Sequence, residues 1–221
     1  YADAFAPENR LAVGYYDAEH REVVVGGLRD PEGFRASLWH ELTHVVLRDF
    51  VGHHYLPAWL DEGFATYFEA TQSTHGLAFA PYPQLDAPRT GRADRHPTLQ
   101  DRTTGQVGSR LHPIYVGVVA RLLRSGGHVD PASFATITYE AFSFVDIDQL
   151  RLHYGVAWSL VHFLLHGDGG QYRTTLQHYF DQISQIPDPT MSYKPAFQIA
   201  FGRIRTRFEG SWRIWASLAA R

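Results

Sequence analysis

The chain has 221 residues, of which 44% are hydrophobic and 19% charged, which is typical of a globular protein with a sizeable buried core. Its formal charge of −3 argues against a nucleic-acid-binding protein, and no apolar run approaches the roughly 20 residues of a membrane-spanning helix. Cysteine is absent, which excludes disulfides, thiolate catalysis and cysteine-ligated zinc. The 13 histidines are therefore the nitrogen ligands through which this chain could bind a metal.

The N-terminal part predicts a β-hairpin followed by a long helix. Residues 11–16 and 21–26 are rich in β-branched and aromatic side chains, with a polar turn between them. Asp30 and Pro31 form a helix-start signal, and apolar residues then recur at helical spacing as far as position 50. We expect this helix to be mostly buried through a broad apolar face that contains Phe34, Leu38, Leu42, Val45 and Val46.

The rest of the chain is predicted to be mainly helical. Pro57 begins a second helix that runs to about residue 72. Residues 73–112 have no clear period and contain several prolines, which favours a long loop that is either functional or disordered. Helical patterns return after this loop. The expected helices are 113–125, one that opens at Asp130 and Pro131, 148–166, 170–185 and 196–220.

These elements predict a single α+β domain over residues 1–221. Residues 1–56 would form a small β-rich lobe together with the first long helix. Residues 57–221 would form a mostly helical lobe.

One motif carries a specific chemistry. His40-Glu41-Leu42-Thr43-His44 matches the pattern H-E-x-x-H, and it lies in the first predicted helix. Residues four apart on a helix have Cβ atoms about 5–6 Å apart, so both imidazoles can bind one zinc ion at about 2.0–2.1 Å. Glu41 would then lie beside a metal-bound water. The alternative is that the pattern arose by chance in a histidine-rich helical domain.

A catalytic zinc usually has three protein ligands, so a third ligand is needed. The metzincin pattern would place it six residues after the second histidine, but Phe50 stands there, and Leu47 replaces the glycine of that pattern. His53 and His54 are close in sequence, but they follow the end of the helix and are displaced from the His40 and His44 stripe.

Glu62 is the better candidate for the third ligand. It lies in the second helix, which a short connection turns back against the first. Glu62, Thr66 and Glu69 share one face of this otherwise apolar helix, and a buried carboxylate is costly unless it is paired or binds a metal. The alternatives are a solvated polar stripe, or Asp61 as the ligand in place of Glu62.

The two segments HELTH and WLDEGFATYFE, with seventeen residues between His44 and Glu62, together resemble the gluzincin metallopeptidases. These include the thermolysin-like and aminopeptidase families, and the preceding hairpin and the segment LPAWL are most similar to the bacterial peptidase-MA-like domains. The resemblance implies a zincin-like fold, a Zn²⁺ cofactor and hydrolysis of peptide bonds. It does not extend to aminopeptidase activity, because residues 26–29 lack the glutamate that grips a free amino terminus.

The predicted roles follow from the motif and the resemblance. We expect His40, His44 and Glu62 to bind zinc and Glu41 to act as the general base. Tyr154, in the segment YGVAW, resembles the catalytic tyrosine of aminopeptidase-type gluzincins and is the expected oxyanion donor; the adjacent His153 is the alternative. Three further polar residues could orient the ligand histidines: Asp61, Thr66 and Glu69.

The expected partner is a peptide or protein substrate, which the segment Val23–Leu28 could bind as an edge strand. A location outside the cytoplasm is favoured, because peptidases of this kind often work there. The alternative function is a catalytically silent zinc-binding domain that binds a peptide or a protein partner.

Overall fold

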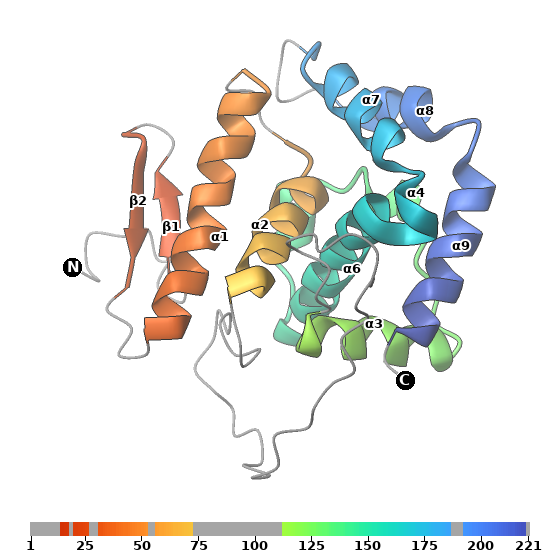
Figure 1. Cartoon of the computed structure of the whole chain (residues 1–221), viewed down its shortest axis with the longest axis horizontal. Helices are drawn as coiled ribbons and strands as arrows, with labels where there is room; N and C mark the ends of the chain where they lie inside the picture. The colour runs from red at the N-terminus through yellow and green to blue at the C-terminus, as the bar shows by residue number, and fades with distance from the viewer. Residues whose placement is uncertain are drawn as a thin grey trace, which may run out of the picture.

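The computed structural model describes residues 14–17, 20–26, 31–52, 56–72, 112–186 and 192–219. This part of the chain is mostly helical with one small antiparallel sheet, in agreement with the predicted α+β class. The hairpin lies at one side of the molecule, α1 and α2 follow, and the other helices form the opposite side (Figure 1). The elements are β1 (Gly14–Asp17), β2 (Glu22–Val25), α1 (Pro31–Phe50), α2 (Ala58–Gln72), α3 (Pro113–Arg124), α4 (Pro131–Phe134), α5 (Tyr139–Ser143), α6 (Ile147–His166), the 3-10 helix η3 (Gly167–Gly170), α7 (Arg173–Ile183), α8 (Lys194–Phe201) and α9 (Arg205–Leu218).

The hairpin pairs β1 with β2 over four residues each, from Gly14 opposite Val25 to Asp17 opposite Glu22. Asp17 was expected in the turn but belongs to the strand. Its side chain accepts a hydrogen bond from the backbone N–H of His20 at 3.0 Å and so closes the turn from the strand end. The predicted residues 11–13 and the predicted helix cap Asp30 lie outside the described residues.

Helix α1 has the predicted bounds, but its buried face is not the predicted one. Phe34 is 39% exposed and Val46 65% exposed, while Leu38, Leu42 and Val45 are partly buried. The buried face instead carries the polar motif, because this is the side on which α2 packs. Its buried residues are Gly33, Ala36, Ser37, His40, Glu41, Thr43, His44 and Leu47.

Helices α2 and α6 form the centre of the core. Gly63 lies where they approach most closely: a Cβ atom there would be 2.7 Å from the carbonyl oxygen of Ala157 and 2.8 Å from Cγ2 of Val161. Glycine is therefore required at this position for the observed packing. The largest fully buried side chains among the described residues are aromatic, and they include Trp59, Trp158, Trp212 and Tyr179.

The predicted helix 196–220 is wrong as a single element, because α8 ends at Phe201 and α9 begins at Arg205. Gly202 closes α8 by donating its N–H to the carbonyl of Gln198 at 2.9 Å. The break lets the ring of Phe208 in α9 pack against that of Phe201, with ring centroids 5.3 Å apart.

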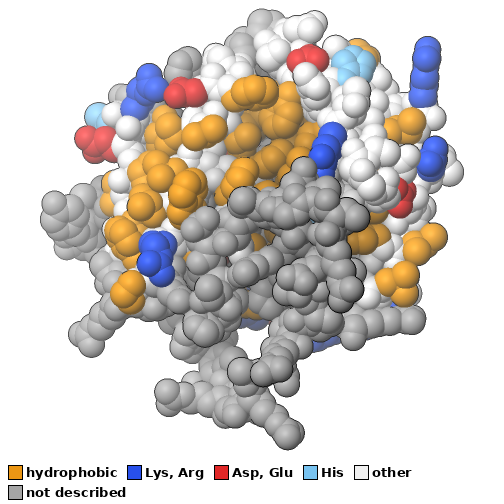
Figure 2. All heavy atoms as spheres, viewed as in Figure 1, with side chains coloured by type: hydrophobic (Ala, Val, Ile, Leu, Met, Phe, Trp, Pro, Cys, Tyr) orange, Lys and Arg blue, Asp and Glu red, His pale blue; other side chains and the backbone are white. Residues whose placement is uncertain are grey.

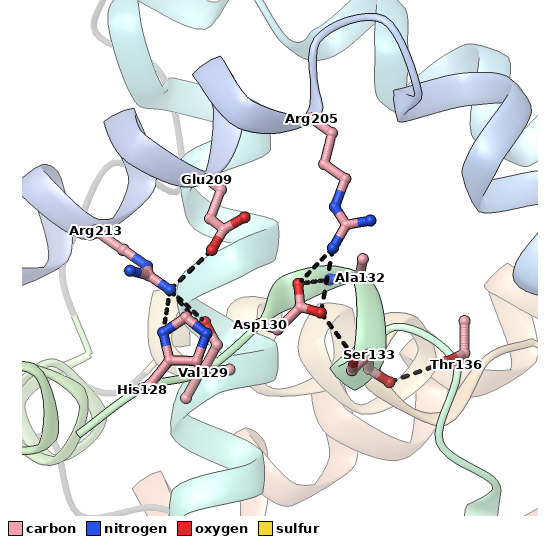
Figure 3. A network of polar contacts seen from close by, with 9 residues as sticks. All are labelled: His128, Val129, Asp130, Ala132, Ser133, Thr136, Arg205, Glu209 and Arg213. Atoms are coloured by element: carbon pink, nitrogen blue, oxygen red, sulfur yellow. Dashed lines mark hydrogen bonds and ion pairs between the residues drawn. The ribbon is translucent and has the colours of Figure 1, made fainter.

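Polar contacts hold α9 against the segment between α3 and α4 (Figure 3). Asp130 caps α4 and also accepts hydrogen bonds from Arg205 at 3.2 Å. Arg213 contacts both the ring of His128 and the carboxylate of Glu209. These contacts are mostly exposed, so we expect them to orient α9 more than to stabilise it.

Exposed hydrophobic side chains gather on the face seen in Figure 2. Phe50 at the end of α1 is 69% exposed, although its ring contacts that of Phe180 in α7.

Within the described residues, none of the helices combines the length and the apolar character that crossing a lipid bilayer requires.

His112, which caps α3, is a buried histidine whose titration should appear in the stability of the fold. Its Nδ1 accepts a hydrogen bond from the N–H of Tyr115 at 3.3 Å, and burial lowers its pKa to about 3 from the usual 6.5. Because the unfolded chain takes up this proton near pH 6.5 and the folded chain does not, stability contributed by neutral His112 is lost as the pH falls from 6.5 toward 3.

We therefore expect His112→Asn, which retains a helix-capping side chain, to show a shallower loss of unfolding free energy between pH 6.5 and pH 4. Urea unfolding at several pH values measures this slope. Parallel pH profiles for the two proteins would show that His112 is not the group responsible.

Candidate metal centre

Helices α1 and α2 bring His40, His44 and Glu62 together in a buried group. The ligand atoms of these three residues all lie within 4.8 Å of one another. Oε2 of Glu62 is 3.4 Å from Nε2 of His40 and 3.9 Å from Nε2 of His44. The spacing of four residues places both imidazoles on the same face of α1, with ring centroids 5.1 Å apart.

A carboxylate lies against the other nitrogen of each imidazole. Nδ1 of His40 is 3.1 Å from Oε2 of Glu69, and Nδ1 of His44 is 2.7 Å from Oδ1 of Asp61. An ionised carboxylate only accepts hydrogen bonds, so Nδ1–H donates in both pairs, and Nε2 is the ring nitrogen that faces Glu62. This is the arrangement of outer carboxylates that orients metal-binding histidines.

Asp61 and Thr66 were each given an alternative role in the sequence. Asp61 is not part of the group of converging ligand atoms, but it contacts the outer nitrogen of His44, where it could orient that histidine, the other role predicted for it. Thr66 is fully buried, but its hydroxyl donates to the carbonyl of Glu62 at 2.7 Å within its own helix. His53, His54 and residues 73–111 of the predicted loop 73–112 lie outside the described residues, while the last residue of that loop, His112, caps α3.

The charge of the group fits a divalent cation. Four carboxylates are buried around the two imidazoles, those of Glu41, Asp61, Glu62 and Glu69. Oε2 of Glu62 is buried and has no hydrogen-bond partner, which is costly for a carboxylate oxygen unless a cation is bound to it. Two imidazoles and one carboxylate are also a common ligand set for zinc.

The charges of these buried side chains also shift the pKa values of the group. Burial alone would lower the pKa of His40, but the nearby carboxylates of Glu62 and Glu69 outweigh burial and raise it well above its usual value. Burial would raise the pKa of Glu62, but the nearby rings of His40 and His44 lower it. The carboxylates therefore favour positive charge, on a proton or on a metal ion, at the point where the three ligand atoms meet.

Glu41 lies beside this group, under strand β1. It is buried, and burial raises its pKa despite the opposing effect of His40 and His44. A Cβ atom on Gly14 would lie 3.0 Å from Cγ and 3.2 Å from Oε1 of Glu41, so the strand passes directly over the carboxylate. The position of Gly14 was missed in the sequence, although a glycine inside a predicted strand is a signal of such close approach.

Tyr154 and His153 are both on α6, but they have different surroundings. The hydroxyl of Tyr154 hydrogen-bonds the carboxylate of Glu62, which brings it to the metal group. The ring of His153 is engaged with the carbonyl of Phe142 and the side chain of Gln149, both at 2.8 Å. The geometry therefore favours Tyr154 over His153 as a residue of the site.

Of the segment Val23–Leu28, β2 contains only the part up to Val25, and residues 27 and 28 lie outside the described residues.

Comparisons with protein-family models, with curated proteins and with solved structures each found no match for this chain.

Proposed function

We propose that this protein is a zinc-dependent peptidase of the gluzincin type, with a zincin-like fold. The observation that carries the proposal is the buried convergence of His40, His44 and Glu62, in which the oxygen nearest both imidazoles has no hydrogen-bond partner. The carboxylates of Asp61 and Glu69 on the outer imidazole nitrogens add support, because they present the inner nitrogens to a cation.

The order of elements also supports the proposal. A hairpin precedes the helix that carries His40 and His44, and the next helix supplies Glu62, as the resemblance to gluzincins implies. The site therefore lies between the β-rich part and the helical part of the chain.

When bound, zinc supplies a Lewis acid that polarises the scissile carbonyl and lowers the pKa of a water molecule to about 7. Glu41 accepts the proton of the attacking water and passes it to the leaving amine. Burial raises the pKa of Glu41, which makes its carboxylate a stronger proton acceptor. Tyr154 donates a hydrogen bond to the oxygen on which negative charge develops.

The experiment that tests the function combines metal analysis with a peptide-cleavage assay. We expect one zinc per chain by elemental analysis, cleavage of a quenched fluorescent peptide library, loss of cleavage with 1,10-phenanthroline and recovery on addition of zinc. Stoichiometric zinc without cleavage would support the silent peptide-binding domain instead. Protein that neither contains nor takes up zinc would contradict both functions.

Gly14→Ala tests whether β1 positions Glu41. The new Cβ would lie 3.0 Å from Cγ of Glu41 and 3.0 Å from the carbonyl oxygen of Val24, so one of these groups must move. We expect kcat to fall roughly tenfold to a hundredfold, because small displacements of a catalytic group are costly. Zinc content should not change.

The matched control for this change is Gly117→Ala, where an added Cβ meets no atom within 4 Å. It should cleave peptides at the wild-type rate. Unchanged kcat in Gly14→Ala would show that the contact between β1 and Glu41 does not affect the reaction.

A further inference from the structure

The short helix α5 is held in one orientation beside Tyr154. Phe142 is fully buried, and its ring meets that of Tyr154 edge-on, with centroids 5.4 Å apart. The carbonyl of Phe142 also lies 2.8 Å from Nδ1 of His153 in α6. These contacts fix the single turn of α5 against the end of α6 that faces the metal group.

Tyr139 lies one turn before Phe142 on α5, so both side chains project from the same face. Unlike Phe142, Tyr139 is 56% exposed. Helix α5 packs against both α6 and α2, the helix that carries Glu62. The negative charge of Glu62, followed by burial, raises the pKa of Tyr139. Tyr139 is therefore open to solvent on one side and close enough to the carboxylates to be affected by their charge.

The hydrogen bonding of the two tyrosines differs. The hydroxyl of Tyr154 is engaged with Glu62. The hydroxyl of Tyr139 contacts the side chain of Ser143, one turn along the same helix. The raised pKa of Tyr139 keeps its phenolic proton in place near neutral pH, so the hydroxyl can donate a hydrogen bond.

We propose that Tyr139 is a substrate-binding residue of this site, whose hydroxyl donates a hydrogen bond to the main chain of a bound peptide and whose exposed ring packs on a substrate side chain. The inference rests on the proposed peptidase function. It assigns different tasks to the two tyrosines: Tyr139 holds the peptide at the mouth of the site, and Tyr154 acts on the developing charge.

Kinetics of Tyr139→Phe and Tyr154→Phe with one cleavable peptide test this division. For Tyr139→Phe we expect KM to rise about three- to tenfold, because the variant loses one hydrogen bond to the substrate. The kcat should stay within about twofold of wild type. For Tyr154→Phe we expect kcat to fall about a hundredfold with little change in KM. Glu140→Gln, an exposed change on the same turn, is the control and should match wild type.

A second measurement does not depend on turnover. With 3-fluorotyrosine at position 139 in Glu41→Gln protein, we expect the ¹⁹F resonance to shift on addition of zinc and again on addition of the peptide. The same label at Tyr172, which packs on Phe163 and Phe208 in the core, should not respond.

The two proposals fail in different ways. If wild type binds zinc and cleaves the peptide, but Tyr139→Phe has the wild-type KM and the label at 139 does not respond to peptide, the role of Tyr139 is wrong and the peptidase function stands. A fall in kcat without a rise in KM would also overturn it. If wild type neither binds zinc nor cleaves peptides, the peptidase function is wrong and the role of Tyr139 with it.

Discussion

Glu41→Gln is expected to remove peptide hydrolysis while zinc stays bound. The glutamine side chain has nearly the same shape but cannot accept the proton of the attacking water, and general-base catalysis contributes about 10²- to 10⁴-fold to such reactions. We therefore expect kcat to fall about a thousandfold, near the middle of that range. The ligand atoms of His40, His44 and Glu62 do not depend on Glu41, so metal content should be unchanged.

Single-turnover cleavage of the fluorescent peptide, together with zinc analysis of the same sample, measures both outcomes. Glu22→Gln, an exposed change of the same kind on β2, is the control and should cleave normally. Cleavage by Glu41→Gln at the wild-type rate would rule out Glu41 as the base, whatever the metal content.

Glu62→Gln is expected to have the largest effect on metal binding. Glu62 contributes the oxygen nearest both imidazoles, and an amide oxygen is a much weaker zinc ligand than a carboxylate. Loss of an outer partner of a ligand histidine costs about 10- to 100-fold in metal affinity, so loss of the ligand itself should cost more than about a hundredfold.

Comparison of several variants shows whether a change in zinc affinity comes from the proposed site. We expect zinc affinity to decrease in the order wild type, Glu69→Gln and Glu62→Gln, because Glu69 contacts only the outer nitrogen of His40. Asp148→Asn changes an exposed carboxylate and should bind zinc like wild type. Competition with a chromophoric chelator gives the affinities, and the rise in Tm on zinc addition gives a second reading. Equal affinity in all four proteins would show that the ion binds elsewhere.

Much of the helical framework could be predicted from the sequence because its signals are local. Proline at the first position and apolar spacing gave the start and end of α1, and the same signals placed α2, α3 and α6 within a residue or two. The convergence of His40, His44 and Glu62 was also expected, since helical spacing and a short connection between two helices are enough to bring these side chains together.

Other features depended on tertiary packing and could not be read in this way. The apolar positions Phe34 and Val46 suggested one buried face for α1, but α2 packs on the polar motif face instead. The choice between the two roles considered for Asp61, metal ligand or partner of a ligand histidine, also needed the structure, because adjacent carboxylates are equivalent in sequence. Tyr139 was missed, because it approaches the site only through the docking of α5.

The close seating of Gly63 against Ala157 has a consequence for how this protein can change over evolutionary time. Gly63 directly follows Glu62, and Ala157 lies one turn after Tyr154, so a backbone contact sets the separation between the metal ligand and the tyrosine. Any side chain at position 63 would wedge the two helices apart and carry the carboxylate away from the phenol. Lineages that keep the chemistry should therefore tolerate repacking around this pair of helices far more readily than a single added methyl group between them.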